Sequence, residues 1–470
     1  FFTFICFTVL STTAATIEAT QPPSSLDEEA NVARPDSAAD TAASLPPGAN
    51  LWRADPRLQS PKIEAARREL TSGNLPACLQ QIHAACVEDG NLPPPSLTLA
   101  YVCFGQKDWP RGLQALEQAA VRHPLHPEVY LTAGQMALRA GRHIDAAVSF
   151  EKALALDPPT QWTAKQADAF PVLCLDGLAT IAERRRDWNT ATQILNRWLE
   201  HDSADPDLLD RSGRALFHAQ KLSEAFDAFS RSFQLNGNMN PPELSMAALH
   251  ATNGDLAAAT PWYEKAQEKY PNDGRVYFEH AGGLLLAGRL DDAQEQLNKA
   301  MEVGKHLERS ATEVELLQGM VARGRGDLAK AERHFTAVLK NSPGHFQAMR
   351  QLPLVLIEQD DPAKHDRAQQ MARILVKRFP RSPAAAVTLG WVTYRSGKGE
   401  DAAIILKAAT AQKADAESLF YTAQVLLEAG SPEETRRAIE ALENAMDQPG
   451  AFLQREQAES WLETSKLLVN

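Results

Sequence analysis

Apolar residues between positions 127 and 160 follow the pattern of two amphipathic helices joined by a short turn. In the first helical segment they recur at helical spacing around Gly134, and a turn at Gly141 ends this segment. The second segment places Ala146 and Phe150 on one face of a helix. Two helices of this length cannot bury their apolar faces against each other alone, so the hairpin requires similar hairpins on either side.

The same pattern recurs along the chain with a period of about 34 residues. The small residue near the start of the second helix recurs as Cys78, Gly112, Ala146, Ala191, Ala225, Ala259, Ala293, Ala331, Ala368, Ala402 and Ala438. The residue four positions later is Ile82, Leu116, Phe150, Leu195, Phe229, Tyr263, Leu297, Phe335, Ala372, Leu406 or Leu442. An ordinary helical bundle is the alternative fold, but a bundle gives no reason for a fixed period.

This recurrence resembles the tetratricopeptide repeat family over roughly residues 60 to 450. The resemblance implies an all-α fold, a right-handed α-α superhelix of about eleven helical hairpins over residues 61–450. Residues 451–470 are predicted to form a helix that caps the last hairpin. We expect Gly134 and Ala146 to face each other across their hairpin, with Phe150 filling the space beside them.

Two irregularities interrupt the period. An insertion around QWTAKQADAFP follows the third repeat, and it predicts either a longer loop or an extra helical turn. In the ninth repeat, Pro353 lies inside the first helix and predicts a kink or a local change of curvature.

The chain begins with a short apolar run, FFTFICFTVL, followed by small residues, as in a secretory signal peptide. The run is too short to span a membrane. We therefore expect residues 1–15 to be the remnant of a leader, and residues 16–60, rich in Ala, Pro, Ser and acidic residues, to be a disordered linker. The expected location is extracytoplasmic, either periplasmic or membrane-tethered. An uncleaved N-terminal anchor and a chance apolar start are the alternatives.

The charge of the chain is acidic and spread out, with 60 acidic and 48 basic residues and a net charge of −12. Because binding to phosphates requires a clustered positive face, nucleic acid is not expected to be the main partner. The densest basic run, Arg184 to Arg186, is interpreted as a solvated helix end, with an RNA site as the alternative.

No motif in the chain indicates catalysis. Walker loops, HExxH, GxSxG and CxxC are absent from the sequence, and the repeats leave no room for a catalytic domain, so we expect neither an enzyme nor a cofactor. His123 and His126 lie beside prolines in an inter-repeat turn and do not make a metal site. The cysteines are either free buried thiols, which we favour, or include a bridge between Cys86 and Cys103 if the protein is exported.

The resemblance also indicates where a ligand would bind. In this family the first helices line the concave face, and ligands meet positions one and four or five residues after the small site. Carried over residue by residue, this implies a groove at Tyr101, Phe104, Gln135, Arg139, Arg184, Arg214, Phe217, His218, Met320, Arg323, Trp391, Tyr394 and Arg395. Arginines and aromatic residues suit an extended peptide or a carboxylate-bearing segment.

The same residues have a structural interpretation. Arginines near the C-terminal ends of helices are favoured by the helix dipole alone, and aromatic residues such as Phe217 can pack between neighbouring first helices. The predicted function is a non-enzymatic scaffold that holds a partner protein or an extended peptide in the concave groove. The alternative is an assembly subunit of a cell-envelope complex that uses its convex face or its ends.

Overall fold

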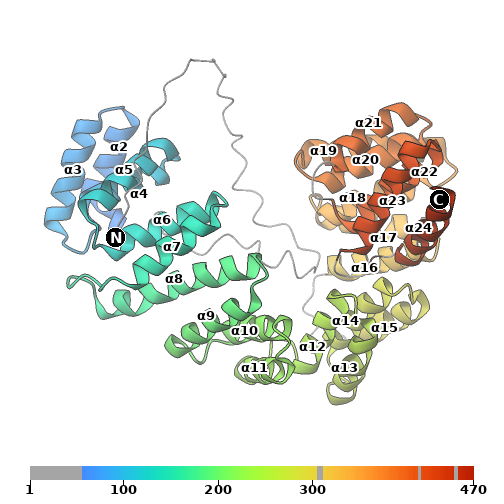
Figure 1. Ribbon diagram of the computed structural model, residues 1–470, viewed down its shortest axis with the longest axis horizontal. Helices are drawn as coiled ribbons and strands as arrows, with labels where there is room; N and C mark the ends of the chain where they lie inside the picture. The colour runs from blue at the N-terminus through green and yellow to red at the C-terminus, as the bar shows by residue number, and fades with distance from the viewer. Residues whose placement is uncertain (1–55, 304–310, 411–413, 449–451, 453, 470) are drawn as a thin grey trace.

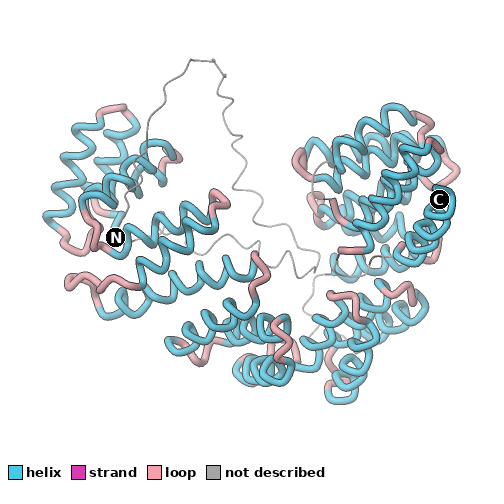
Figure 2. The backbone as a smooth tube through the Cα atoms, in the orientation of Figure 1, coloured by secondary structure: helices cyan, strands magenta, loops and turns pink. Residues whose placement is uncertain are grey.

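The computed structural model describes residues 56–303, 311–410, 414–448, 452 and 454–469 (Figure 1). Across this part of the chain the secondary structure is helical and contains no strand (Figure 2). Consecutive α-helices form eleven antiparallel hairpins, from α2/α3 to α22/α23, and α24 packs against α23. The predicted all-α repeat architecture with a C-terminal capping helix is confirmed.

The first six hairpins are α2 (Pro61–Thr71) with α3 (Leu75–Glu88), α4 (Pro95–Gly105) with α5 (Trp109–Arg122), α6 (Pro127–Arg139) with α7 (His143–Leu154), α8 (Ala164–Arg184) with α9 (Trp188–His201), α10 (Pro206–His218) with α11 (Leu222–Leu235), and α12 (Pro242–Thr252) with α13 (Leu256–Lys269). The remaining elements are α14 (Gly274–Leu286) with α15 (Leu290–Val303), α16 (Ala311–Gly324) with α17 (Leu328–Asn341), α18 (Phe346–Ile357) with α19 (Pro362–Arg378), α20 (Pro383–Arg395) with α21 (Gly399–Thr410), α22 (Ala416–Ala429) with α23 (Pro432–Met446), and α24 (Arg455–Val469).

The hairpins follow one another along an arc, with the N-terminal hairpins on one arm and the C-terminal hairpins on the other (Figure 1). The first helix of each hairpin contacts the first helix of the next, as α6 contacts α8 and α12 contacts α14. Second helices such as α11 and α13 lie on the outer side of the arc. We call the face formed by the first helices the inner face.

The core consists of the repeated small and large positions of the second helices, all of which are buried. The packing differs in detail from the expectation that Gly134 faces Ala146. A Cβ atom on Gly134 would lie 2.6 Å from Cε1 of Phe150, so the atoms closest to this glycine belong to the aromatic ring. Gly177 of α8 lies on another side of the same ring, where a Cβ atom would be 2.4 Å from Cε2. Phe150 is therefore held between two glycines from successive first helices.

The insertion after the third repeat lengthens a helix. It extends the N-terminal end of α8, which has 21 residues. The extension begins with a capping box, in which Thr163 and Gln166 each bond to the backbone of the other. In the ninth repeat, α18 runs through Pro353 without a break, and the expected kink at that residue remains a prediction.

The described part begins at residue 56, a few residues before the predicted boundary at residue 60. Pro56–Gln59 forms a 3-10 helix, η3, in which Leu58 is buried and Arg57 binds Glu128 of α6 at 2.7 Å. The leader at 1–15, most of the linker at 16–60 and the extracytoplasmic location depend on residues outside the described part and remain predictions. None of the described helices is long and apolar enough to cross a membrane.

The cysteines of the described part are free thiols, which excludes the alternative bridge between Cys86 and Cys103 in this structure. The Sγ atom of Cys86 lies 3.7 Å from the Thr98 hydroxyl. Cys103 is fully buried, and this burial raises the pKa of its thiol to about 12. These cysteines serve as small core residues.

The pH dependence of stability is expected to depend on His280 of α14. Its ring stacks on Tyr263 at a centroid distance of 4.5 Å, and its Nδ1 accepts a hydrogen bond from Gln267 at 3.0 Å. Burial, and then the charge of Arg289, lower the pKa of His280 to about 4. Because an unfolded histidine has a pKa of about 6.5, the unfolded chain takes up this proton first as the pH falls.

We therefore expect the stability of α13 and α14 to be highest above about pH 6.5 and to decrease as the pH falls toward 4. Hydrogen exchange of these helices at several pH values measures the effect. The His280→Phe variant cannot bind the proton and should show a weaker dependence on pH. An identical pH profile in both proteins would rule out His280 as the source.

Candidate functional site

Polar side chains join successive first helices along the inner face. Arg211 of α10 reaches back to α8, where it donates to Asp176 at 2.6 Å and to Glu183 at 2.7 Å. In the N-terminal hairpins, the Tyr101 hydroxyl of α4 donates to Glu128 of α6 at 3.0 Å. Much of the polar surface that a groove would offer is therefore used to hold neighbouring hairpins together.

Five of the predicted groove residues are buried and cannot meet a ligand: Tyr101, Phe104, Gln135, Phe217 and Trp391. Their burial has two causes. First helices contact each other directly and enclose side chains such as Phe217, and the Phe104 ring packs against Gly112 of α5 within its own hairpin. Phe217, for example, makes an edge-to-face contact with His250 of α12 at 4.8 Å. At the aromatic positions the side chains therefore serve to pack the helices together.

Four predicted residues are half-buried and already have partners or close neighbours. The ring of His218 stacks on Trp188 at 4.4 Å, and the Tyr394 hydroxyl donates to Glu428. Met320 packs against the apolar core of the C-terminal hairpins. Arg323 belongs to a cluster described below.

The remaining four predicted residues, Arg139, Arg184, Arg214 and Arg395, are exposed. Arg139 lies over the Trp109 ring at 5.0 Å, Arg214 pairs with Asp210 and Arg395 pairs with Glu358 at 2.8 Å. Among the described residues, Arg184 has no carboxylate within ion-pair distance. Three of these four exposed residues, Arg139, Arg184 and Arg214, come from the consecutive first helices α6, α8 and α10, which belong to hairpins three to five.

An ion-pair cluster occupies the inner face at the C-terminal end. We call it the Arg–Glu cluster; its members are Arg323, Arg350, Asp415, Glu417 and Tyr421. Arg323 donates to Glu417 at 2.9 Å and also bonds to the Tyr421 hydroxyl. Arg350, whose side chain is 5% exposed, binds Asp415 at 2.8 Å and Glu417 at 3.1 Å. The cluster therefore joins α16 and α18 to the start of α22.

The electrostatics of the cluster stabilise the ionised form of Glu417. Burial alone would raise the pKa of Glu417, but the guanidinium groups of Arg350 and Arg323 outweigh burial and hold the pKa below its usual range. Burial raises the pKa of Tyr421 to about 12, so its hydroxyl remains protonated at neutral pH. Glu417 is therefore a carboxylate held between two arginines.

Sequence reasoning found Arg323 but missed Arg350, Asp415 and Glu417. Arg323 and Glu417 are 94 residues apart, and a period of one repeat does not indicate contact between the eighth and eleventh hairpins. One local signal was available, because Arg350 is the only charged residue in the apolar helix α18, FQAMRQLPLVLI. A buried arginine requires an acidic partner from elsewhere in the chain.

Stacked helical hairpins of this kind define an α-helical repeat solenoid. A family model described as tetratricopeptide repeat matches residues 97–159, 316–364 and 363–417. These matches show that the chain contains tetratricopeptide repeats, and the hairpins of the structure have the helix–turn–helix form of such repeats. A TPR repeat-containing protein of Pseudomonas aeruginosa is 26% identical over 208 residues, which are 44% of this chain and 34% of that relative. The match thus spans about a third of the length of the relative.

Several solved structures match this chain at low identity and low TM-score. Yeast Tom70 is 13% identical with a TM-score of 0.39, and the match covers 86% of this chain and 95% of that one. A human IFIT1 dimer with PPP-AAAA is 15% identical with a TM-score of 0.40, covering 83% and 94%. PilF of Pseudomonas aeruginosa is 18% identical with a TM-score of 0.27, covering 48% and 96%.

Proposed function

We infer that this chain binds a protein partner, because tetratricopeptide repeats are a general module for protein–protein interaction. We propose that this chain is a non-enzymatic scaffold that holds an extended, carboxylate-bearing segment of a partner protein on the inner face of hairpins three to five. The observation that carries the proposal is the series of exposed guanidinium groups of Arg139, Arg184 and Arg214 on consecutive first helices.

The chain itself contains an example of the proposed chemistry. Arg323 lies four residues after the small site Gly319, and Arg139 and Arg184 lie five residues after their small sites. Arg323 binds a carboxylate, Glu417, at 2.9 Å. All three arginines lie in the last turn of a first helix, and a guanidinium group there can bind a carboxylate through two parallel hydrogen bonds.

The proposed mechanism is preorganisation. The first helices are fixed to one another by bonds such as Arg211 to Asp176, at 2.6 Å, before any partner arrives. An extended segment can then be held by a few contacts, because the scaffold loses little conformational entropy on binding. At the C-terminal end the inner face is occupied by the Arg–Glu cluster, so the proposal places the partner in the N-terminal half.

A capture experiment tests the location of the groove. The full chain is used as bait, its bound proteins are identified by mass spectrometry, and the experiment is repeated with Arg184→Glu combined with Arg214→Ala. We expect the main bound partner to be lost by about tenfold, because charge complementarity is reversed. The control is Arg381→Glu, a similarly exposed arginine in the turn between α19 and α20.

Capture that is unchanged in the double variant would contradict the groove and favour the alternative, an assembly subunit that uses its convex face. Val87 of α3 and Val121 of α5 give that alternative some support, because they occupy equivalent places in successive hairpins and are 87% and 81% exposed. Their replacement by serine would then abolish capture.

A further inference from the structure

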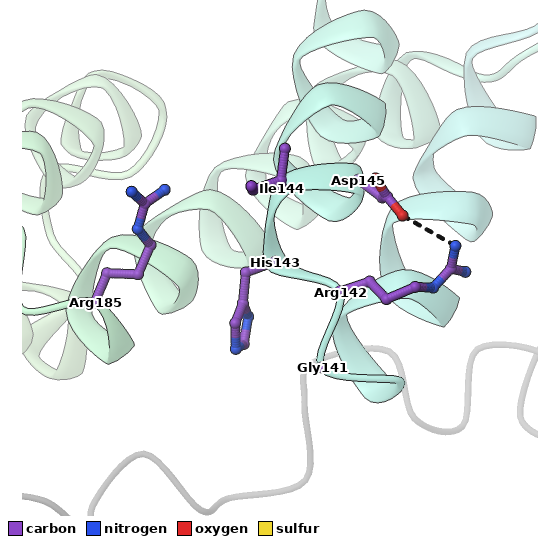
Figure 3. Close-up of a pocket in the computed structure, with 6 residues that line it drawn as sticks. All are labelled: Gly141, Arg142, His143, Ile144, Asp145 and Arg185. Atoms are coloured by element: carbon purple, nitrogen blue, oxygen red, sulfur yellow. Dashed lines mark hydrogen bonds and ion pairs between the residues drawn. The ribbon is translucent and has the colours of Figure 1, made fainter.

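A pocket lies at the edge of the solenoid where the turn of the third hairpin meets the end of α8 (Figure 3). Its volume is about 520 Å³, and it is lined by Gly141, Arg142, His143, Ile144 and Asp145 from one side. Arg185 of the fourth hairpin faces this segment from the other side of the pocket. We call it the turn-edge pocket. None of the predicted groove residues lines it.

We propose that the turn-edge pocket is a second docking site, which binds an acidic protein segment that carries an apolar side chain. This site goes beyond the proposed function, because it lies outside the inner face and does not depend on a ligand there. The proposal rests on three features of the pocket: unpaired positive charge, exposed apolar side chains and a concave shape.

The positive charge comes from the end of α8. Arg185 is the C-cap residue of that helix and Arg186 follows it in the turn; both are exposed. In the part of the chain that the structure describes, neither guanidinium group has a carboxylate partner. Arg142 pairs with Asp145 at 3.0 Å, but both side chains are more than half exposed, so this ion pair is weak and open to exchange. In a chain with a net charge of −12, such an unbalanced positive site favours an acidic ligand.

The apolar contribution comes from α7. Ile144 and Val148 lie one helical turn apart on the same face, and they are 72% and 65% exposed. Figure 3 shows Ile144 on the first turn of α7, with Arg185 across from it. A side chain of the ligand that covers Ile144 would therefore bring a neighbouring carboxylate of the same segment within reach of Arg185.

These features favour a protein segment over a nucleic acid. Single-stranded nucleic acids bind proteins through tracks of basic residues interleaved with aromatic side chains on which bases stack. The turn-edge pocket offers the aliphatic Ile144, with the exposed Val148 one turn further along α7, and no residue that lines the pocket is Phe, Tyr or Trp. Its positive charge is also too local to neutralise a run of phosphates.

Fluorescence anisotropy with defined probes tests the proposal. The full chain is titrated into a labelled short peptide of alternating Glu and Leu, a peptide with Lys in place of Glu, a peptide with Ser in place of Leu, and a short oligothymidylate. We expect the Glu–Leu peptide to bind best. Arg185→Glu and Ile144→Ser should each weaken its binding by about tenfold.

Matched controls keep the test specific. Arg381→Glu and Ile404→Ser change an exposed arginine and a 70% exposed isoleucine elsewhere on the solenoid, and both should leave the affinity unchanged. Circular dichroism of each variant verifies that the helical fold is intact. The inner-face variant Arg214→Ala separates the two sites. If Arg214→Ala abolishes peptide binding and Arg185→Glu does not, the result supports the proposed groove and overturns the turn-edge site. Absence of peptide binding, or tighter binding of the oligothymidylate, would also overturn it.

Discussion

Replacement of Phe150 by alanine is expected to lower the free energy of unfolding of the surrounding hairpins by about 3–5 kcal/mol. The ring is 1% exposed and lies between Gly134 of α6 and Gly177 of α8, so its removal leaves a cavity that two helix backbones line. Urea unfolding measures the loss, and hydrogen exchange should place it in α6 to α8. Val148→Ala on the same helix removes an exposed side chain and should cost less than about 0.5 kcal/mol.

The same packing predicts the sign of a glycine substitution. Alanine generally stabilises a helix relative to glycine by about 1 kcal/mol. At Gly177, however, the added Cβ atom would lie 2.4 Å from the Phe150 ring, and overpacking of this kind costs about 1–3 kcal/mol. We therefore expect Gly177→Ala to destabilise the protein, whereas Gly282→Ala, which has no neighbouring atom within 4 Å, should stabilise it. A stabilising Gly177→Ala would show that the ring is not confined as described.

The second large effect is expected at the Arg–Glu cluster. Arg350→Ala should destabilise the C-terminal hairpins by about 3–5 kcal/mol, because it leaves the carboxylate of Glu417, whose side chain is 17% exposed, with too little positive charge. Hydrogen exchange should show the loss in α22 to α24, although the substitution lies in α18. The effect should depend little on salt, since buried pairs are poorly screened.

Arg437→Ala is the matched control for that variant. Arg437 pairs with Glu433 on α23, but the two side chains are 48% and 75% exposed, so the pair should contribute less than about 1 kcal/mol. Similar losses in the two variants would mean that the cluster stabilises no more than a surface ion pair. A loss confined to α18 would mean that it does not connect distant hairpins.

The fold could be predicted from the sequence because each hairpin repeats a local pattern. The small residue Ala146 and the large residue Phe150 recur at fixed places, and their burial in every repeat follows from contacts between neighbours. What the repeat pattern did not contain was the role of Gly177, which lies two residues before the small site Ala179. It belongs to the next repeat, and an alignment of small sites passes over it.

The candidate groove was predictable only in part. The spacing identified the first helices that form the inner face but not which of their side chains reach solvent, because direct contact between first helices encloses Phe217 and Trp391. Contacts between distant hairpins, such as Arg323 with Glu417, depend on the curvature of the whole stack. Curvature results from small rotations that accumulate over many repeats, and no single residue encodes it.

The Arg–Glu cluster also affects how the C-terminal hairpins move relative to one another. A stack that is held only by contacts between neighbouring hairpins bends easily, because each hairpin can tilt a little against the next. By joining α16 and α18 to α22, the cluster directly connects the eighth and ninth hairpins to the eleventh. We therefore expect the C-terminal hairpins to move together as one unit.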